Sequence, residues 1–103
     1  MKSLNRSSET GHWTITKIAR TAAAKIEGLD LRVQEKVLLR LDELQADPYQ
    51  GDVKKIRGKF DLYRLRIGEH RLYFRLVPKS RSIEILLFES RSSIKRRTIQ
   101  RLT

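Results

Sequence analysis

Four arginines occur at alternating positions on both sides of Gly68-Glu69. A two-residue connection that begins with glycine is typical of a tight β-hairpin, and its register would place Arg66 directly opposite Arg71. Opposed residues share a face of a sheet, and opposed like charges are destabilising. An anion is their natural complement, because a guanidinium can donate two parallel hydrogen bonds to a phosphate; the alternative is a face of cations that are only solvated. The predicted face carries Arg64, Arg66, Arg71, Tyr73 and Arg75.

The other basic residues are concentrated in the same half of the chain. The chain has 103 residues, 23 Lys+Arg and 12 Asp+Glu, and a formal net charge of +11. Residues 1–53 carry eight charges of each sign, so residues 54–103, with fifteen bases and four acids, account for the whole excess. This asymmetry predicts a polyanionic partner, with nucleic acid as the first candidate. Basic residues that could extend the surface are Lys54, Lys55, Arg57, Arg91, Lys95 and Arg97.

Other chemistry has little support in the sequence. The chain has no Cys and two isolated histidines, His12 and His70, so we expect no metal site and no thiol nucleophile. Its glycines form no phosphate-binding loop and no serine lies in a nucleophile elbow, so we expect no cofactor. The longest apolar run, Ile85–Phe88, is far shorter than the roughly 20 residues of a membrane helix, and there is no signal-peptide core. We therefore expect a cytoplasmic protein.

The first half of the sequence predicts a strand and two helices behind an N-terminal arm. Residues 1–11 are polar and aperiodic, which indicates a flexible arm, and apolar–polar alternation predicts a strand over His12–Ile18. Apolar residues at three- and four-residue spacing then predict two helices that meet at Gly28 to Asp30. Asp30 is the predicted N-cap of the second helix, which ends at Asp47-Pro48. We expect them to form a helical hairpin. The predicted apolar stripe of the second helix is Val33, Val37, Leu38, Leu41 and Leu44.

The second half predicts a basic loop followed by three antiparallel strands. The loop covers Asp47–Lys59, and the strands are Leu62–Ile67, His70–Val77 and Ser82–Glu89, with Ile83, Ile85 and Leu87 alternating in the last. A basic helix is predicted over Ser92–Leu102. The sequence thus predicts one small α+β domain over residues 12–103: an N-terminal strand, a helical hairpin, a three-stranded antiparallel meander and a C-terminal basic helix.

Several short motifs occur in this order at characteristic intervals. Lys55-Ile56-Arg57-Gly58 is followed by Leu62-Tyr63-Arg64-Leu65-Arg66, then by Gly68 with Arg71-Leu72-Tyr73, and finally by Glu89-Ser90-Arg91. From Trp13 to the C-terminus the chain resembles the RelE/ParE superfamily of toxins from type II toxin–antitoxin systems. The resemblance implies a RelE-like fold with a curved sheet and a basic cleft, and a cognate antitoxin protein as partner.

The resemblance implies two alternative activities. RelE-like members cut messenger RNA in the ribosomal A site, whereas ParE-like members poison DNA gyrase and lack the cleavage residues. Basic residues that surround the scissile phosphate in the RelE branch are matched here by Arg64, Arg66, Arg71 and Arg91, which favours a ribosome-dependent mRNA endoribonuclease. A tyrosine common in the C-terminal segment of that branch falls at Arg97, so this feature is absent or moved. A third possibility is a nucleic-acid-binding module without activity.

Metal-free RNA cleavage requires the ribose 2′-hydroxyl to attack the adjacent phosphorus, with charge developing on the phosphoryl and departing oxygens. Fixed cations stabilise that charge. On this hypothesis Arg71 and Arg91 bind the phosphoryl oxygens, and Arg64 and Arg66 position the strand and stabilise the leaving group. Arginine stays protonated and is a poor general base. Alternative groups for proton transfer are Lys54, Lys55, His70, Tyr73 and Glu89.

Overall fold

The computed structural model describes residues 12–59 and 61–90. The predicted N-terminal arm (residues 1–11) and the predicted C-terminal helix (Ser92–Leu102) lie outside the described residues. The same holds for three of the predicted site residues, Arg91, Lys95 and Arg97. The remaining predicted site residues are all described.

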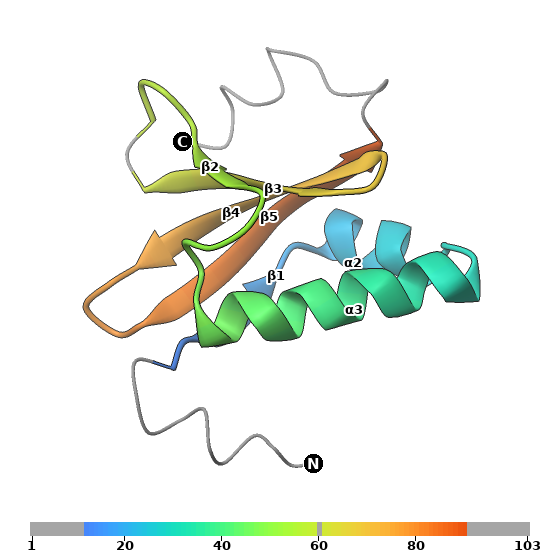
Figure 1. Ribbon diagram of the computed structural model, residues 1–103, viewed down its shortest axis with the longest axis horizontal. Coiled ribbons are helices and arrows are strands. Elements are labelled where there is room, and N and C mark those ends of the chain that lie inside the picture. The colour runs from blue at the N-terminus through green and yellow to red at the C-terminus, as the bar shows by residue number, and fades with distance from the viewer. Residues whose placement is uncertain (1–11, 60, 91–103) are drawn as a thin grey trace.

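Five strands of the described chain form one mixed sheet in the order β1-β5-β4-β3-β2 (Figure 1). The predicted meander consists of β3 (Leu62–Ile67), β4 (His70–Val77) and β5 (Ser82–Ser90), which pair antiparallel. The predicted N-terminal strand is β1 (Thr14–Ile18), which pairs in parallel with the first half of β5. The chain therefore has the predicted small α+β architecture.

A fifth strand was not predicted. β2 (Val53–Lys55) lies within the stretch predicted as loop, and it pairs antiparallel with β3 at the edge of the sheet. Two of its three residues are lysines, which have low strand propensity, so the local sequence gives no strand signal. Pairing with β3 forms this strand, and lysines are common on edge strands because they discourage further pairing.

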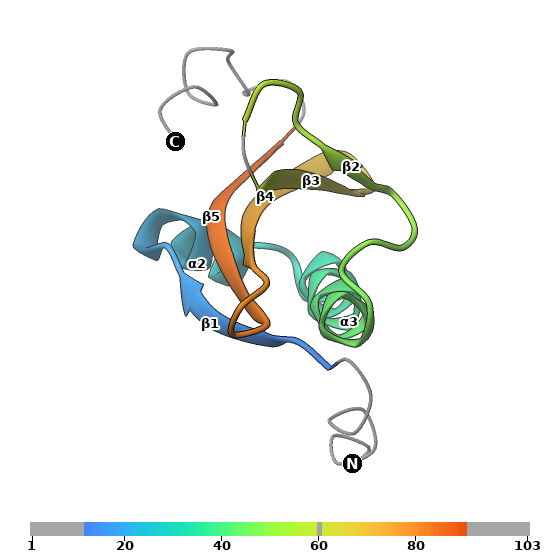
Figure 2. The ribbon, with the colours of Figure 1, turned by 90° about the vertical axis from the view of Figure 1, so that its left-hand side faces the viewer.

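Two helices cover one face of the sheet. α2 (Arg20–Glu27) and α3 (Leu31–Ala46) are the predicted helical pair. The sheet curves round α3 and α2 lies close to β5 (Figure 2). Asp30 is the N-cap residue of α3 as predicted, but its side chain makes no capping hydrogen bond. Within the described residues, neither helix is long and apolar enough to cross a membrane.

The hydrophobic core lies between this face and the two helices. Trp13 is 8% exposed and belongs to the core. α3 contributes three residues of its predicted stripe, but Leu38 is 52% exposed, so the prediction of its burial was wrong. Leu38 follows Val37 by about 100° around the helix, which turns it away from the sheet. The buried cluster comprises Trp13, Ala22, Ile26, Val37, Leu41, Leu44, Leu65, Ile67, Leu72, Phe74, Leu76, Ile83, Ile85 and Phe88.

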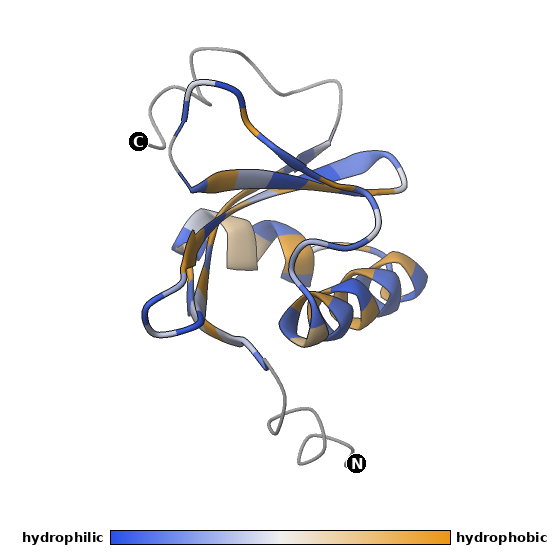
Figure 3. Cartoon of the chain, turned by 60° about the vertical axis from the view of Figure 1, so that its left-hand side comes forward, coloured by the Kyte–Doolittle hydropathy of each residue, from blue (hydrophilic) through white to orange (hydrophobic). Residues whose placement is uncertain are grey.

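An irregularity in β5 changes which of its side chains face the helices. Phe74 is opposite Ile85, but the preceding residue Tyr73 is opposite Leu87, so Leu86 is the extra residue of a β-bulge. The alternation therefore shifts by one position after Ile85. Phe88 joins the core, whereas Leu87 lies on the other face of the sheet, contrary to the simple alternation predicted from sequence. Hydrophobic residues recur along the strands, whereas the turn between β4 and β5 is hydrophilic (Figure 3).

Candidate nucleic-acid interface

The β3–β4 hairpin has the register that its turn predicts. Arg66 is opposite Arg71 and Arg64 is opposite Tyr73, and all six pairs between the two strands agree with the prediction. Gly68 begins the turn with φ of 60°, a conformation that glycine adopts without strain. Residues alternating with these arginines belong to the core, so the arginines lie on the face of the sheet away from the helices. We call this the outer face.

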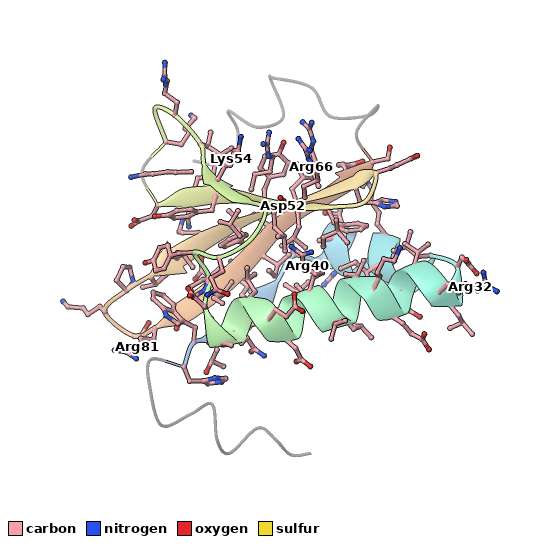
Figure 4. All side chains as sticks on the ribbon, viewed as in Figure 1. Arg32, Arg40, Asp52, Lys54, Arg66 and Arg81 are labelled. Atoms are coloured by element: carbon pink, nitrogen blue, oxygen red, sulfur yellow. The ribbon has the colours of Figure 1, made fainter. Side chains whose placement is uncertain are left out.

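The edge strand β2 adds one lysine to the outer face. Lys54 is opposite Arg64 and therefore shares its face, whereas Lys55 is opposite Tyr63 and lies on the helix-facing side. Lys54 and Arg66 project from the same side of the sheet, away from α3 (Figure 4). Arg57 follows β2 and is exposed in the connection to β3. Of the two predicted lysines, Lys54 alone therefore joins the arginines of the hairpin.

Four cations of the outer face have no acidic partner within the part of the chain that the structure describes. Among the described residues, no ion pair is formed by Lys54, Arg64, Arg66 or Arg71. We call these four residues the cationic cluster. The Nε atom of Arg64 is buried and has no hydrogen-bond partner in the structure. An unsatisfied buried donor is costly, and the opposed Arg66 and Arg71 repel each other. A bound anion would relieve both conflicts.

The predicted cluster ends before Arg75. This arginine is opposite Glu84, and its Nη1 atom lies 3.4 Å from Oε1 of that carboxylate. The ion pair neutralises Arg75 locally, although the residue lies on the same face as the cationic cluster. Arg75 thus differs from the other three arginines of the hairpin in having an acidic partner.

The outer face also has a small set of buried apolar side chains, which we call its apolar floor. Tyr73 is 1% exposed, and it lies with Leu62 and Leu87 outside the helix-facing core. Tyr73 is opposite both Arg64 and Leu87 on its two neighbouring strands. A ring that is this deeply buried offers no surface for a base to stack on. Its position instead supports the side chains around it, so the RNA contact predicted for Tyr73 has no support in this conformation.

An ion pair that the sequence did not predict lies beside Arg71. Lys25, in the last turn of α2, forms a salt bridge with Glu89 of β5. Glu89 is opposite Arg71 in the sheet. The two partners are far apart in the sequence and neither belongs to a motif, so no periodicity or spacing could have indicated this contact.

The fold separates the five candidates for proton transfer. His70 stacks on Phe88 of the core at a ring-centroid distance of 5.1 Å, and Lys55 lies on the same helix-facing side. Tyr73 is buried and Glu89 is paired with Lys25. Lys54 is thus the candidate that is both exposed and within the cationic cluster.

Tyr63 has a perturbed pKa, but it belongs to the helix-facing side. Burial raises its pKa above the ordinary 10.0, and the nearby Tyr49 and Asp61 raise it further. Its ring stacks on Phe74 at 5.7 Å and meets the edge of the Tyr49 ring at 6.0 Å. Tyr63 therefore remains neutral at physiological pH and contributes to packing rather than to the outer face.

The fold described above recurs in solved toxin structures. The archaeal RelE–RelB complex from Pyrococcus horikoshii OT3 has a chain with 26% identity and a TM-score of 0.68, with 82% of the present chain and 100% of that chain covered. The isolated Escherichia coli RelE toxin is 18% identical with a TM-score of 0.65, covering 89% and 99% of the two chains. A YoeB/ParE toxin from Agrobacterium tumefaciens is also 18% identical, with a TM-score of 0.64 and coverage of 76% and 96%.

The chain therefore has the RelE-like toxin fold. The family described as ParE toxin of type II toxin-antitoxin system, parDE, matches residues 15–94. The chain belongs to this family, within the RelE/ParE toxins of type II toxin–antitoxin systems. No curated protein gives a significant match to the sequence.

Proposed function

We propose that this toxin inhibits translation by cutting messenger RNA in the ribosomal A site. The cationic cluster would bind the scissile phosphate, and the ribose 2′-hydroxyl would attack the phosphorus to leave a 2′,3′-cyclic phosphate and a free 5′-hydroxyl. The observation that carries this proposal is the group of four cations on the outer face of β2, β3 and β4 that form no ion pair with any described residue. Such a group matches the negative charge that develops in the transition state.

Each cation has a distinct place in the proposal. Arg71 would bind the phosphoryl oxygens together with Arg91, which directly follows Ser90 at the end of β5. Arg64 and Arg66 would hold the strand and stabilise the leaving oxygen. The orphaned Nε of Arg64 supports this role, since a phosphate oxygen would supply the missing acceptor. The ribosome would add orientation, which can be worth about 7 to 11 kcal/mol of the barrier.

Lys54 is the residue that we propose for proton transfer. It is exposed, and it lies opposite Arg64 within the cationic cluster. A neutral amine could accept the 2′-hydroxyl proton, whereas the arginines stay protonated. Replacement of Lys54 by Met should therefore lower the cleavage rate more than it lowers RNA affinity.

A cognate antitoxin is the second partner that we propose. Similar structures include RelE–RelB complexes from Pyrococcus horikoshii OT3 and Escherichia coli and a RelBE2 complex from Mycobacterium tuberculosis. An acidic or amphipathic segment that folds on binding would complement a chain of net charge +11. Co-expression with such a protein should suppress growth inhibition.

The decisive experiment compares two arginines of the same strand. Wild type, Arg71→Ala and Arg75→Ala are induced in cells, and a reporter mRNA is mapped by primer extension with and without translation. We expect cuts in the translated mRNA with wild type, a loss on the order of 10²-fold with Arg71→Ala, and little change with Arg75→Ala. Thermal unfolding of the purified variants shows that each is folded. Equal activity of wild type and Arg71→Ala would overturn the proposal.

Inhibition of DNA gyrase is the second candidate function. The observation that favours it is the family match itself, which is to ParE toxins. On this alternative, reporter mRNA stays intact and gyrase–DNA complexes accumulate after induction. RNA binding without cut products or trapped gyrase would instead indicate a nucleic-acid-binding module.

A further inference from the structure

On the outer face, two arginines are each opposite a glutamate, but only one of the two arginines forms an ion pair with its opposed glutamate. Both are formed by the same two strands: Arg75 is opposite Glu84, and Arg71 is opposite Glu89. Oppositely charged residues at such positions attract each other across the sheet. Arg75 forms an ion pair with Glu84, with 3.4 Å between Nη1 and Oε1, whereas Arg71 forms no ion pair with Glu89. Glu89 is instead bound by the ammonium group of Lys25.

The topology explains how a helix residue reaches this position. β1 pairs only with residues Ser82 to Ile85, so among the described residues no strand lies beside the second half of β5 on that side. α2 follows β1 in the chain and lies close to β5 in both views (Figure 1, Figure 2). Its residues Ala22 and Ile26 are buried in the core. Lys25 precedes Ile26 in the last turn of α2, and its ammonium group forms the salt bridge with Glu89.

We infer that Lys25 is a positioning residue that keeps Arg71 available for an anion. This inference rests on the proposed function, in which Arg71 binds RNA phosphate. By occupying Glu89, Lys25 removes the carboxylate that would otherwise pair with Arg71, as Glu84 pairs with Arg75. The side chain of Glu89 is 18% exposed, so water screens this competition only weakly. Arg75 is thus neutralised by its opposed glutamate, whereas Arg71 has no acidic partner among the described residues because Lys25 holds Glu89.

The first measurement follows Arg71 without RNA. The side-chain Nε–H resonance of Arg71 is recorded by NMR in wild type, Lys25→Met and Lys25→Arg. Methionine keeps most of the lysine stem and removes the charge, whereas arginine restores it. We expect the Arg71 resonance to shift and to exchange more slowly with water in Lys25→Met, because Arg71 then pairs with Glu89. Lys25→Arg should resemble wild type, and Lys36→Met, which removes an exposed charge from α3, should not move the resonance.

The second measurement is the salt dependence of RNA binding. The probe is a short 2′-O-methyl oligoribonucleotide, which lacks the attacking hydroxyl and stays intact. Loss of one phosphate contact lowers the slope of log K against log salt by about 0.7 for a single strand. We expect a decrease of about this size in Lys25→Met and in Arg71→Ala. Lys25→Met combined with Glu89→Gln should restore the wild-type slope, because the competing carboxylate is then absent.

The outcomes separate the inference from the proposed function. An unchanged Arg71 resonance in Lys25→Met would overturn the inference. A double variant that binds RNA as weakly as Lys25→Met would also overturn it, because Lys25 would then contact RNA directly. If the Arg71 resonance responds but Arg71→Ala leaves the RNA slope unchanged, Lys25 controls the ion pair as inferred, and the phosphate role of Arg71 is wrong.

Discussion

The two faces of the sheet differ in how fully their side chains find favourable partners within the described chain. On the helix-facing side, Leu72, Phe74 and Ile83 are 0% exposed and pack against α2 and α3. On the outer face a small apolar floor is bordered by the cationic cluster, whose members have no acidic partner in the described chain and include an orphaned buried nitrogen. The helix-facing side stabilises the fold, whereas the outer face retains repelling cations and a buried donor without an acceptor. Such a local conflict is expected where a protein binds a ligand.

The largest expected effect on stability comes from a substitution on the helix-facing side. Phe74→Ala removes a 0% exposed ring that stacks on Tyr63. The lost burial and the resulting cavity should lower the free energy of unfolding by about 3 to 5 kcal/mol, measured by urea denaturation. Phe74→Leu, which refills most of the volume, should lower the free energy of unfolding by clearly less. Equal losses in both variants would show that volume at this position does not determine stability.

A smaller effect of opposite sign is expected on the outer face. Arg64→Met keeps an extended side chain and removes both the orphaned Nε–H and one charge of the cationic cluster. We expect the free energy of unfolding to rise by about 1 kcal/mol, while RNA affinity falls. Urea denaturation and binding to the 2′-O-methyl oligoribonucleotide measure the two quantities in one preparation.

Arg75→Met is the matched control for this prediction, because Arg75 has an acidic partner on the same face. It should not raise stability, since it breaks an ion pair instead of relieving repulsion. If Arg64→Met destabilises the protein by as much as a core truncation, Arg64 stabilises the fold and the contrast between the faces fails at this position.

The sequence predicts the hairpin and its four arginines because the turn is so short. A two-residue connection that begins at Gly68 leaves one register, and the alternation along β3 and β4 then assigns every side chain to a face. No such constraint acts on β5, where the bulge at Leu86 moves Leu87 to the outer face and Phe88 into the core. A bulge depends on how the strand packs, and the alternation Ile83, Ile85, Leu87 gives no sign of it.

The parts of the site that could not be predicted come from other elements. β2 is a three-residue edge strand that depends on pairing with β3, so Lys54 could be named as basic but not assigned to a face. Lys25 meets Glu89 because α2 packs close to β5. Both contacts follow from tertiary arrangement, whereas the sequence patterns used for prediction extend over one element or one turn.

The smallest expected effect tests whether the helix-facing side tolerates charge at its margin. The pKa of Tyr63 is raised by burial first and then by Tyr49 and Asp61, so the folded protein releases the phenolic proton at higher pH than the unfolded chain. Stability from this group is fully present below pH 10 and is lost as pH rises through the folded-state pKa. Urea denaturation from about pH 9 to about pH 11 should therefore show a smaller alkaline loss in Tyr63→Phe than in wild type. Lysines titrate alike in both proteins, so they cancel in the difference. An identical loss would mean that Tyr63 ionises as freely in the fold as in the unfolded chain, so that packing at this margin does not oppose its charge.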